Sequence, residues 1–329
     1  MWLMWTGFLA FVLLLLALDL GVFNKTAHAP TVREALAFTA MTAALAVAFS
    51  GFVYVAYSNH WEGLGLTVDA VDRQLNDGRL ATVKFLTGYI VEMSLSMDNV
   101  FVIALIFEHL RVPLAQQHRV LFWGIIGALG MRGAMIAGGA ALVARYHWIL
   151  YVFGVFLVYT ALRMLLAKRK EESPEESFVV RWLGRHFRVT KEFHGSRFRV
   201  TVEGKRFITP LFVALVLVET TDLVFAVDSI PAIFAITTDP FLVFTSNVFA
   251  ILCLRSLYFG LAGLIEKFKY LKVSLAVILG FVGIKMLVAK WTVELLGEAV
   301  NFWMLGIVAG ILVSGALASV VAERNSVRR

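Results

Sequence analysis

The chain has 329 residues, of which 60% are hydrophobic and only 16% are charged. This composition lies outside the range of soluble globular proteins and indicates a membrane protein. A single cysteine excludes a disulfide framework and a thiolate metal cluster, and the formal charge of +7 needs a nucleic-acid, lipid or topological explanation.

Apolar stretches long enough to cross a bilayer recur along the chain. A spanning helix needs about 20 consecutive, mostly apolar residues, and this window predicts an all-α, polytopic membrane helix bundle of about nine transmembrane helices. The candidate spans are 2–20, 34–57, 82–107, 120–143, 147–167, 209–236, 241–264, 271–289 and 301–321. Because no lysine or arginine precedes Leu20, we expect the first span to be a retained helix rather than a signal peptide.

The basic residues are unevenly divided between the two sides of this predicted bundle. With the N-terminus outside, 21 of the 30 lysines and arginines fall in inside segments, 5 fall outside and 4 lie within apolar segments. Basic residues accumulate in cytoplasmic loops. We therefore expect an inner-membrane protein with the N-terminus outside and the C-terminus in the cytoplasm. The surplus positive charge is then topological, and no nucleic-acid partner is expected.

Two segments outside the apolar stretches stand out. Residues 169–208 form a basic cytoplasmic loop, in which the alternation at 197–202 followed by Glu203-Gly204 predicts a small β-hairpin. No catalytic constellation appears in this loop, so we expect neither enzyme activity nor a covalently bound cofactor. The acidic loop 58–80 would face outside, and we expect the substitution Asp69→Asn in that loop to do little.

The chain also repeats itself at a nearly constant offset. Residues 98–101 align with 222–225, Arg132 aligns with Arg255, and 163–168 align with 285–290, at offsets of 124, 123 and 122. Each repeat holds three spans, an odd number, so adjacent copies must have opposite orientations. Inverted repeats of this kind occur in many secondary transporters, with the substrate site near the midplane at the repeat interface.

This repeat predicts five parts of the chain. They are two N-terminal helices with an outside loop (1–80), a first three-helix repeat (81–168), the cytoplasmic loop (169–208), a second three-helix repeat (209–290), and a last helix with a cytoplasmic tail (291–329).

Ionisable residues inside the apolar segments mark the candidate site. Two segments carry five carboxylates, Glu92, Asp98, Glu219, Asp222 and Asp228. Each interior charge costs about 2.5–3.5 kcal/mol on insertion scales, so such residues usually face a cavity or a partner. Arg132 and Arg255 oppose them, whereas Arg163 and Lys285 lie near helix ends and can snorkel. Structural ion pairs would use two of the five carboxylates, and a bound divalent cation or protonation would account for the surplus.

The neighbours of these carboxylates are oxygen donors. They are Ser94, Ser96 and Asn99 in the first segment, and Thr220, Thr221 and Ser229 in the second. Magnesium, calcium and manganese prefer such ligands, unlike copper and zinc. We predict a metal site made of Glu92, Asp98, Asn99, Glu219, Asp222 and Asp228, in which Asp98 and Asp222 bind the ion together. Structural or gating partners would be Arg132, Arg255, Ser96, Ser229 and Pro231, with the arginines pairing with the carboxylates when the metal has left.

A helix break is expected in the second carboxylate segment. On a straight helix Asp228 lies about 180° from Glu219, so the two acids would point in opposite directions. Pro231 cannot donate a hydrogen bond to the Val227 carbonyl, which predicts a break or kink at 228–231. Broken helices free backbone carbonyls for ions at transporter sites.

These stretches resemble a known family. Residues 92–101, EMSLSMDNVF, are similar to the first signature of the TerC family and of its Alx branch in particular, and 219–232, ETTDLVFAVDSIPA, are similar to the second. Segments 209–212, 237–240, 245–250 and 254–255 extend the similarity. The resemblance implies about nine helices, a link to the LysE superfamily of exporters and manganese(II) efflux. The family is also associated with tellurium resistance, and Alx-like members with redox modulation.

Three functions from different classes follow. The residues indicate transport of an oxygen-ligated divalent cation, manganese or calcium, in either direction, and the resemblance favours manganese(II) export, with protons entering as metal leaves. A tellurite-resistance or redox-modulating membrane protein that acts through partners is the alternative, and the sequence identifies no such partner. A membrane enzyme or redox component is the third, although the chain has no cysteine pair, haem-type histidine pair or cofactor motif.

Overall fold

The computed structural model describes residues 1–18, 32–166, 178–190, 192–261 and 271–327. Its long helices are α1 (Trp2–Leu18), α2 (Val32–Ser58), α3 (Gly78–His109), α4 (Leu114–Arg145), α5 (Ile149–Leu166), α7 (Pro210–Phe234), α8 (Pro240–Leu261), α9 (Leu271–Leu287) and α11 (Ala299–Val327). The shorter elements are η2 (Trp61–Gly63), α6 (Phe178–His186), β1 (Arg199–Val202), β2 (Lys205–Ile208) and α10 (Ala289–Leu296). The prediction of a nearly all-α polytopic bundle is confirmed.

The helix lengths in the described part of the chain give fewer complete spans than the nine predicted from hydropathy. Within the described residues, seven helices are long and apolar enough to cross a membrane, and the pair α9 and α10, bent by 81°, makes an eighth if it forms one span. The apolar helix α1 is shorter than a full span. The count of nine therefore stays a prediction.

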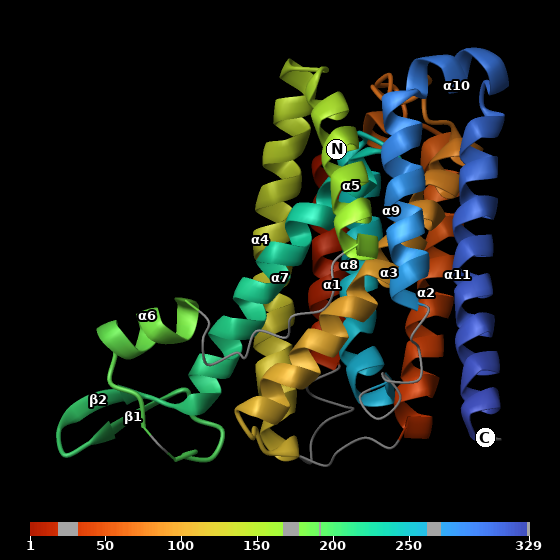
Figure 1. Cartoon of the computed structure of the whole chain (residues 1–329). Coiled ribbons are helices and arrows are strands. Elements are labelled where there is room, and N and C mark those ends of the chain that lie inside the picture. The colour runs from red at the N-terminus through yellow and green to blue at the C-terminus, as the bar shows by residue number, and fades with distance from the viewer. Residues whose placement is uncertain (19–31, 167–177, 191, 262–270, 328–329) are drawn as a thin grey trace.

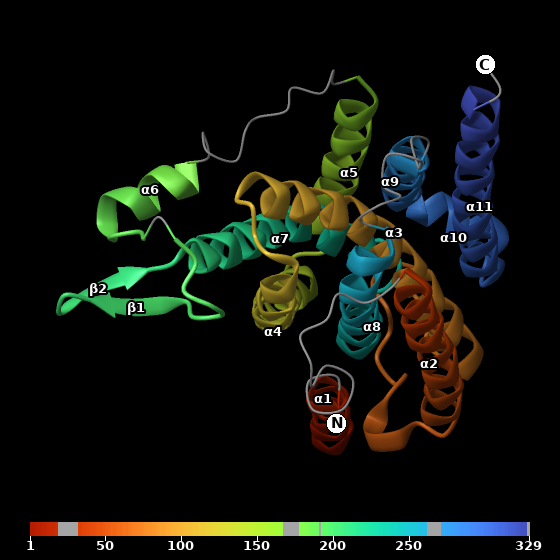
Figure 2. The same ribbon diagram turned by 90° about the horizontal axis from the view of Figure 1, so that it is seen from below.

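The helices stand side by side, with α1 beginning at one end of the bundle and α11 ending at the other (Figure 1). Helix α3 packs against α8, α4 against α7, and α5 against α9, while α2 and α11 cover α3 from other sides (Figure 2). An inverted repeat would map α3, α4 and α5 onto α7, α8 and α9. It would therefore map the contact between α3 and α8 onto the contact between α7 and α4, and the contact between α5 and α9 onto itself. The packing agrees with that symmetry, and the superposition of the repeats stays a prediction.

Local sequence explains where the two carboxylate-bearing helices, α3 and α7, begin. Asp77 caps α3, since its side chain accepts a hydrogen bond from the Leu80 amide at 2.7 Å. Thr209 caps α7 in the same way, and Pro210 follows at the first helical position, where its missing N–H costs nothing. Helix α7 then runs without interruption through Pro231 to Phe234. The helix is therefore not broken at 228–231, because the proline lies in the last turn and few backbone bonds remain beyond it to lose, and a kink there stays a prediction.

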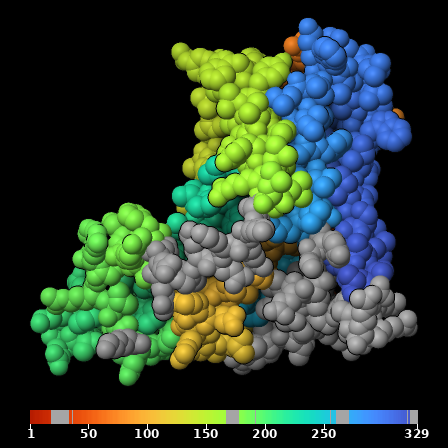
Figure 3. Space-filling model, viewed as in Figure 1, coloured from red at the N-terminus to blue at the C-terminus, as the bar shows by residue number. Residues whose placement is uncertain are grey.

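The predicted β-hairpin is confirmed. Strands β1 and β2 pair antiparallel, with Arg199 opposite Ile208 and Val202 opposite Lys205. Glu203 and Gly204 form the turn, with φ values of 50° and 75°, the left-handed region that suits a two-residue hairpin. Helix α6 precedes the hairpin and was not predicted. Together these elements project beside the lower end of the bundle (Figure 3).

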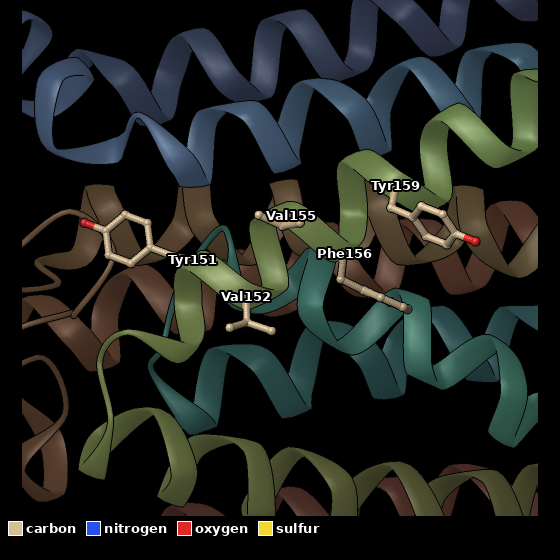
Figure 4. A pocket seen from close by; sticks show the side chains of 5 residues that line it. All are labelled: Tyr151, Val152, Val155, Phe156 and Tyr159. Atoms are coloured by element: carbon tan, nitrogen blue, oxygen red, sulfur yellow. The ribbon is translucent and has the colours of Figure 1, made fainter.

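The outer surface of α5 carries an apolar groove. Its lining residues are Tyr151, Val152, Val155, Phe156 and Tyr159 (Figure 4). The groove is open and holds no carboxylate, so it does not contain the predicted site. The carboxylates lie instead in the interior of the bundle.

Candidate functional site

Arg132 of α4 lies at the centre of a buried polar cluster. The residue is 1% exposed. Its guanidinium donates two hydrogen bonds to Asp222 of α7, from Nε to Oδ2 at 3.1 Å and from Nη2 to Oδ1 at 2.9 Å, a bidentate arrangement. Its Nη1 also forms an ion pair with Glu92 of α3, which is fully buried. One arginine thus joins carboxylates from two helices, and the predicted pairing of Arg132 with membrane carboxylates is present.

Three neutral side chains complete this cluster. Nη1 of Arg132 also donates to Ser229 Oγ at 3.3 Å and to Asn247 Oδ1 at 3.2 Å. Asn99 donates from Nδ2 to Asp222 Oδ1 at 3.4 Å. Asn247, on α8, was not among the predicted site residues. The available signal was an amide inside an otherwise apolar segment, next to Thr245 and Ser246.

Several buried oxygens around this cluster lack a hydrogen-bond donor in the described part of the chain. They are Glu92 Oε2, Ser96 Oγ, Asn99 Oδ1 and Glu219 Oε2. Buried polar atoms are normally paired, and leaving one unpaired costs about 1–3 kcal/mol. All four atoms belong to α3 and α7, and all are ligand types for a hard cation. The cluster therefore has unused oxygen-ligand capacity.

Glu219 lies against the backbone of α4. A Cβ added at Gly127 would collide with the Glu219 carboxylate, so the glycine makes the room that this side chain occupies. Gly127 is five residues from Arg132, a rise of about 7.5 Å along the helix. Glu219 of α7 thus lies against the helix that carries Arg132, near the arginine cluster but not part of it.

The other predicted ligands are placed differently. Asp228 accepts a hydrogen bond from Thr160 Oγ1 of α5 at 3.2 Å, so it faces α5. Asp98 is half-buried on α3 and interacts with another group. The side chain of Arg255 lies outside the described part of the structure. Joint binding of an ion by Asp98 and Asp222 stays a prediction.

The six predicted metal ligands do not form a ready-made metal centre. Among the described residues, no three or more histidine, cysteine, aspartate or glutamate side chains are grouped so that they could hold a metal ion. The structure brings Glu92, Asn99 and Asp222 together, but Arg132 lies between the carboxylates. Arg132 lies where the Glu92 and Asp222 carboxylates converge, as expected for a site without its metal, and the six-ligand metal site stays a prediction.

A second buried charged cluster lies at the end of the bundle where α3 begins. Lys84, which is 1% exposed, forms ion pairs with Asp69 at 2.8 Å and with Asp72 at 2.7 Å, and donates to Asn76 Oδ1 at 2.7 Å. Asp69, which is 3% exposed, also accepts hydrogen bonds from Thr237 and Thr238. The premise of the expectation for Asp69→Asn, a solvated residue in an outside loop, is wrong, because the loop folds back into the bundle; the effect of the substitution itself stays a prediction.

Further groups tie this second cluster to other helices. Tyr57 of α2 donates to Asp239 at 2.9 Å, and Asn301 of α11 donates to Asp72 at 2.9 Å. Lys285 is also buried, and its Nζ donates to the Ala235 carbonyl at 3.0 Å. It does not snorkel as predicted, because the C-terminal end of α7 offers it a backbone acceptor.

The two loop carboxyls of this cluster titrate in opposite directions. Burial raises the pKa of Asp69, but the adjacent Lys84 ammonium and the hydrogen bonds to it outweigh burial, so the pKa lies below its ordinary value. Burial also raises the pKa of Asp239, and the hydrogen bond from Tyr57 offsets only part of that rise. The net pKa of Asp239 lies above its ordinary value.

Comparison with known proteins decides the family. The family model described as Integral membrane protein TerC family matches residues 78–327, which run from the start of α3 to the end of α11. The chain belongs to the TerC family. The resemblance predicted from residues 92–101 and 219–232 is confirmed, and both carboxylate helices of this TerC protein lie inside the matched region.

Curated relatives cover nearly all of this TerC chain. A membrane protein of Myxococcus xanthus named STKORF319 is 45% identical over 98% of this chain and 93% of its own length. The Escherichia coli K12 protein described as the membrane-bound redox modulator Alx is 44% identical over 94% of this chain and 92% of its own. A membrane protein of Rickettsia bellii is 36% identical over 99% of both chains. No solved structure matches this TerC protein.

Proposed function

We propose that this TerC-family protein exports a divalent metal cation, manganese(II), across the inner membrane, with its N-terminus outside and its C-terminus in the cytoplasm. The observation that carries the proposal is the sharing of buried Arg132 by Glu92 and Asp222. Spanning segments rarely contain such groups unless they line a substrate or ion pathway.

The charge of the cluster suits a divalent ion. Glu92 and Asp222 of the cluster and the nearby Glu219 carry three negative charges when ionised, and Arg132 carries one positive charge, so the cluster together with Glu219 has a net charge of −2. The unpaired oxygens of α3 and α7 are carboxylate, amide and hydroxyl atoms. These are ligands for manganese, calcium or magnesium, and the family resemblance favours manganese among them.

Arg132 acts in this proposal as a tethered counter-ion. When the cargo binds, it displaces the guanidinium from Glu92 and Asp222, and when the cargo leaves, Arg132 returns. The carboxylates are then never left unpaired in the membrane interior, where an uncompensated charge is costly. Carboxylates crowded together also exchange a cation for protons readily, because like charges disfavour joint ionisation. We therefore include proton uptake in exchange for metal release.

Transport in proteoliposomes tests the proposal. Manganese(II) flux is measured with a metal-sensitive dye for the wild type, Glu92→Gln and Asp222→Asn, and the matched control is Glu108→Gln, an exposed residue of the same helix as Glu92. We expect flux to be lost in the first two variants and retained in the control. Wild-type flux in both cluster variants would remove the site, and flux that ignores an imposed pH gradient would remove the proton coupling.

Redox modulation, the activity in the name of the Escherichia coli relative, is the alternative function. The sole cysteine, Cys253, is buried. A redox effect would therefore act through protein partners or through cellular metal content. Measuring the thiol–disulfide balance of cells at fixed manganese content separates the two routes, because only an effect through protein partners would persist.

A further inference from the structure

Helix α6 is held at the level where a spanning helix leaves the bundle. Its Leu183 is buried with Ile208 and with Leu211, a residue in the first turn of α7. Helix α7 is long and apolar enough to span a membrane, so its first turn lies close to the bilayer surface. Figure 1 shows α6 lying across the direction of the bundle helices, beside the lower part of α7.

The unit that contains α6 is firmly attached to the bundle. Arg119 of α4 donates to Ser196 Oγ at 3.2 Å and lies over the Phe198 ring, 5.0 Å from its centroid. Thr209 Oγ1 donates to the Arg197 carbonyl at 2.7 Å. These contacts fix the hairpin, and with it α6, against α4 and α7. The exposed face of α6 is therefore presented at a set depth.

That exposed face combines aromatic and cationic side chains. Val179, Val180 and Leu183 point toward the hairpin and α7 and are buried or half-buried. On the opposite side, Phe178 is 74% exposed and Trp182 is 45% exposed. At about 100° per residue, the exposed Arg181 and Arg185 lie next to these two rings, both on the same side of them. Neither arginine forms an ion pair within the described residues.

The charge of the whole unit points to an anionic partner. Residues 178–208 contain eight lysines and arginines but only two acidic residues, a net charge of +6. Tryptophan and arginine together on one helix face are typical of helices that lie in the membrane interface. A nucleic acid would use the same charge, but it would not account for a rigid aromatic face fixed at bilayer depth.

We propose that α6 is an interfacial helix that binds anionic phospholipid headgroups of the membrane that holds the bundle. Phe178 and Trp182 lie at the boundary between headgroups and acyl chains, and Arg181 and Arg185 contact lipid phosphates. The inference does not depend on metal transport.

A depth measurement on the full-length protein tests this inference. A nitroxide is attached at Phe178→Cys, and separately at the exposed β1 residue Thr201→Cys, both in a Cys253→Ser background. The accessibility of the nitroxide to oxygen and to a water-soluble nickel complex is compared at each position, in phosphatidylcholine vesicles with and without phosphatidylglycerol. We expect the label at 178 to be reached by oxygen and shielded from nickel when phosphatidylglycerol is present, and the label at 201 to stay accessible to nickel.

Removing charge from the α6 face provides the second arm. Each arginine near an anionic surface contributes about 1 kcal/mol, so Arg181→Gln/Arg185→Gln should weaken the affinity of the α6 face for phosphatidylglycerol, measured by the shielding of the label at 178, roughly thirty-fold. The matched pair Lys205→Gln/Arg206→Gln, which removes the same charge from β2, should change it far less. A label at 178 that is as accessible to nickel as the label at 201 in both lipids would overturn the proposal. Protection by added RNA, with no effect of phosphatidylglycerol, would assign the face to nucleic acid and overturn it too.

Discussion

Replacing Arg132 by glutamine tests the idea that this side chain is the internal counter-ion of the carboxylate cluster. The substitution removes two hydrogen bonds to Asp222 and the ion pair with Glu92, and leaves both carboxylates without a cation. Removing one partner of a buried ion pair costs about 3–5 kcal/mol. Because Arg132 serves two carboxylates, we expect a loss near the upper end, about 5 kcal/mol of unfolding free energy.

The assay is unfolding of the protein in lipid–detergent micelles, with and without manganese(II). Arg145→Gln is the matched control, since Arg145 ends the same helix and is exposed, and it should change the unfolding free energy by less than about 0.5 kcal/mol. A divalent ion that binds the bare carboxylates should restore part of the loss in Arg132→Gln, by about 2.7 kcal/mol at a concentration one hundred times its Kd.

A double substitution separates charge from packing. Arg132→Gln/Glu92→Gln removes one of the two uncompensated carboxylates, so it should be more stable than Arg132→Gln alone, and the coupling between the two sites should exceed about 0.5 kcal/mol. If Arg132→Gln were as stable as Arg145→Gln, or if the double variant were no better than the single one, the counter-ion role of Arg132 would be refuted.

Three further predictions concern positions around the two buried clusters. Gly127→Ala should reduce manganese(II) flux several-fold by pushing the Glu219 carboxylate aside, whereas Gly130→Ala, which meets no atom within 4 Å, should transport normally in the same vesicle assay. Lys84→Met leaves Asp69 and Asp72 buried without a cation and should cost about 3–5 kcal/mol in chemical unfolding, whereas the exposed Lys290→Met should be close to neutral. Because the pKa of Asp69 is lowered, its contribution to the unfolding free energy is complete above the ordinary aspartate pKa of about 3.9 and is lost as the pH falls through the lower folded pKa. Because the pKa of Asp239 is raised, the unfolding free energy falls as the pH rises from about 3.9 toward the higher folded pKa of that residue. When the melting temperature is plotted against pH, Asp69→Asn should reduce its pH dependence below about 3.9, and Asp239→Asn should reduce it above about 3.9. Unchanged pH profiles in both variants would contradict these assignments.

Hydropathy and local patterns were sufficient for the elements that depend on few neighbours. The apolar spans, the hairpin at 199–208 and the burial of Glu92 and Asp222 follow from composition, alternation and the cost of placing charge among apolar residues. The pairing of Arg132 with those carboxylates was also expected, because few interior cations are available to meet them.

Tertiary contacts decide the remaining features, and they leave no local mark in the sequence. Asp69 and Asp72 lie between apolar segments, where acidic residues are usually solvated, and only the folded chain brings Lys84 to them. Pro231 was expected to break α7, but its position in the last turn matters more than its chemistry. Asp228 is adjacent to Ser229 in the sequence. Ser229 nevertheless contacts Arg132 whereas Asp228 faces Thr160, because adjacent positions of a helix point about 100° apart.

Both buried clusters use the same arrangement, a basic side chain of the chain itself shared by two carboxylates. Arg132 joins Glu92 and Asp222, and Lys84 joins Asp69 and Asp72. Lys84 and Glu92 both belong to α3 and are eight residues apart, about 12 Å along the helix. A cation that binds either pair must compete with a tethered positive charge, so a monovalent ion gains nothing in charge by the exchange. A divalent ion adds one unit of positive charge at the same carboxylates, and that difference supports selection for divalent cargo at the Arg132 cluster.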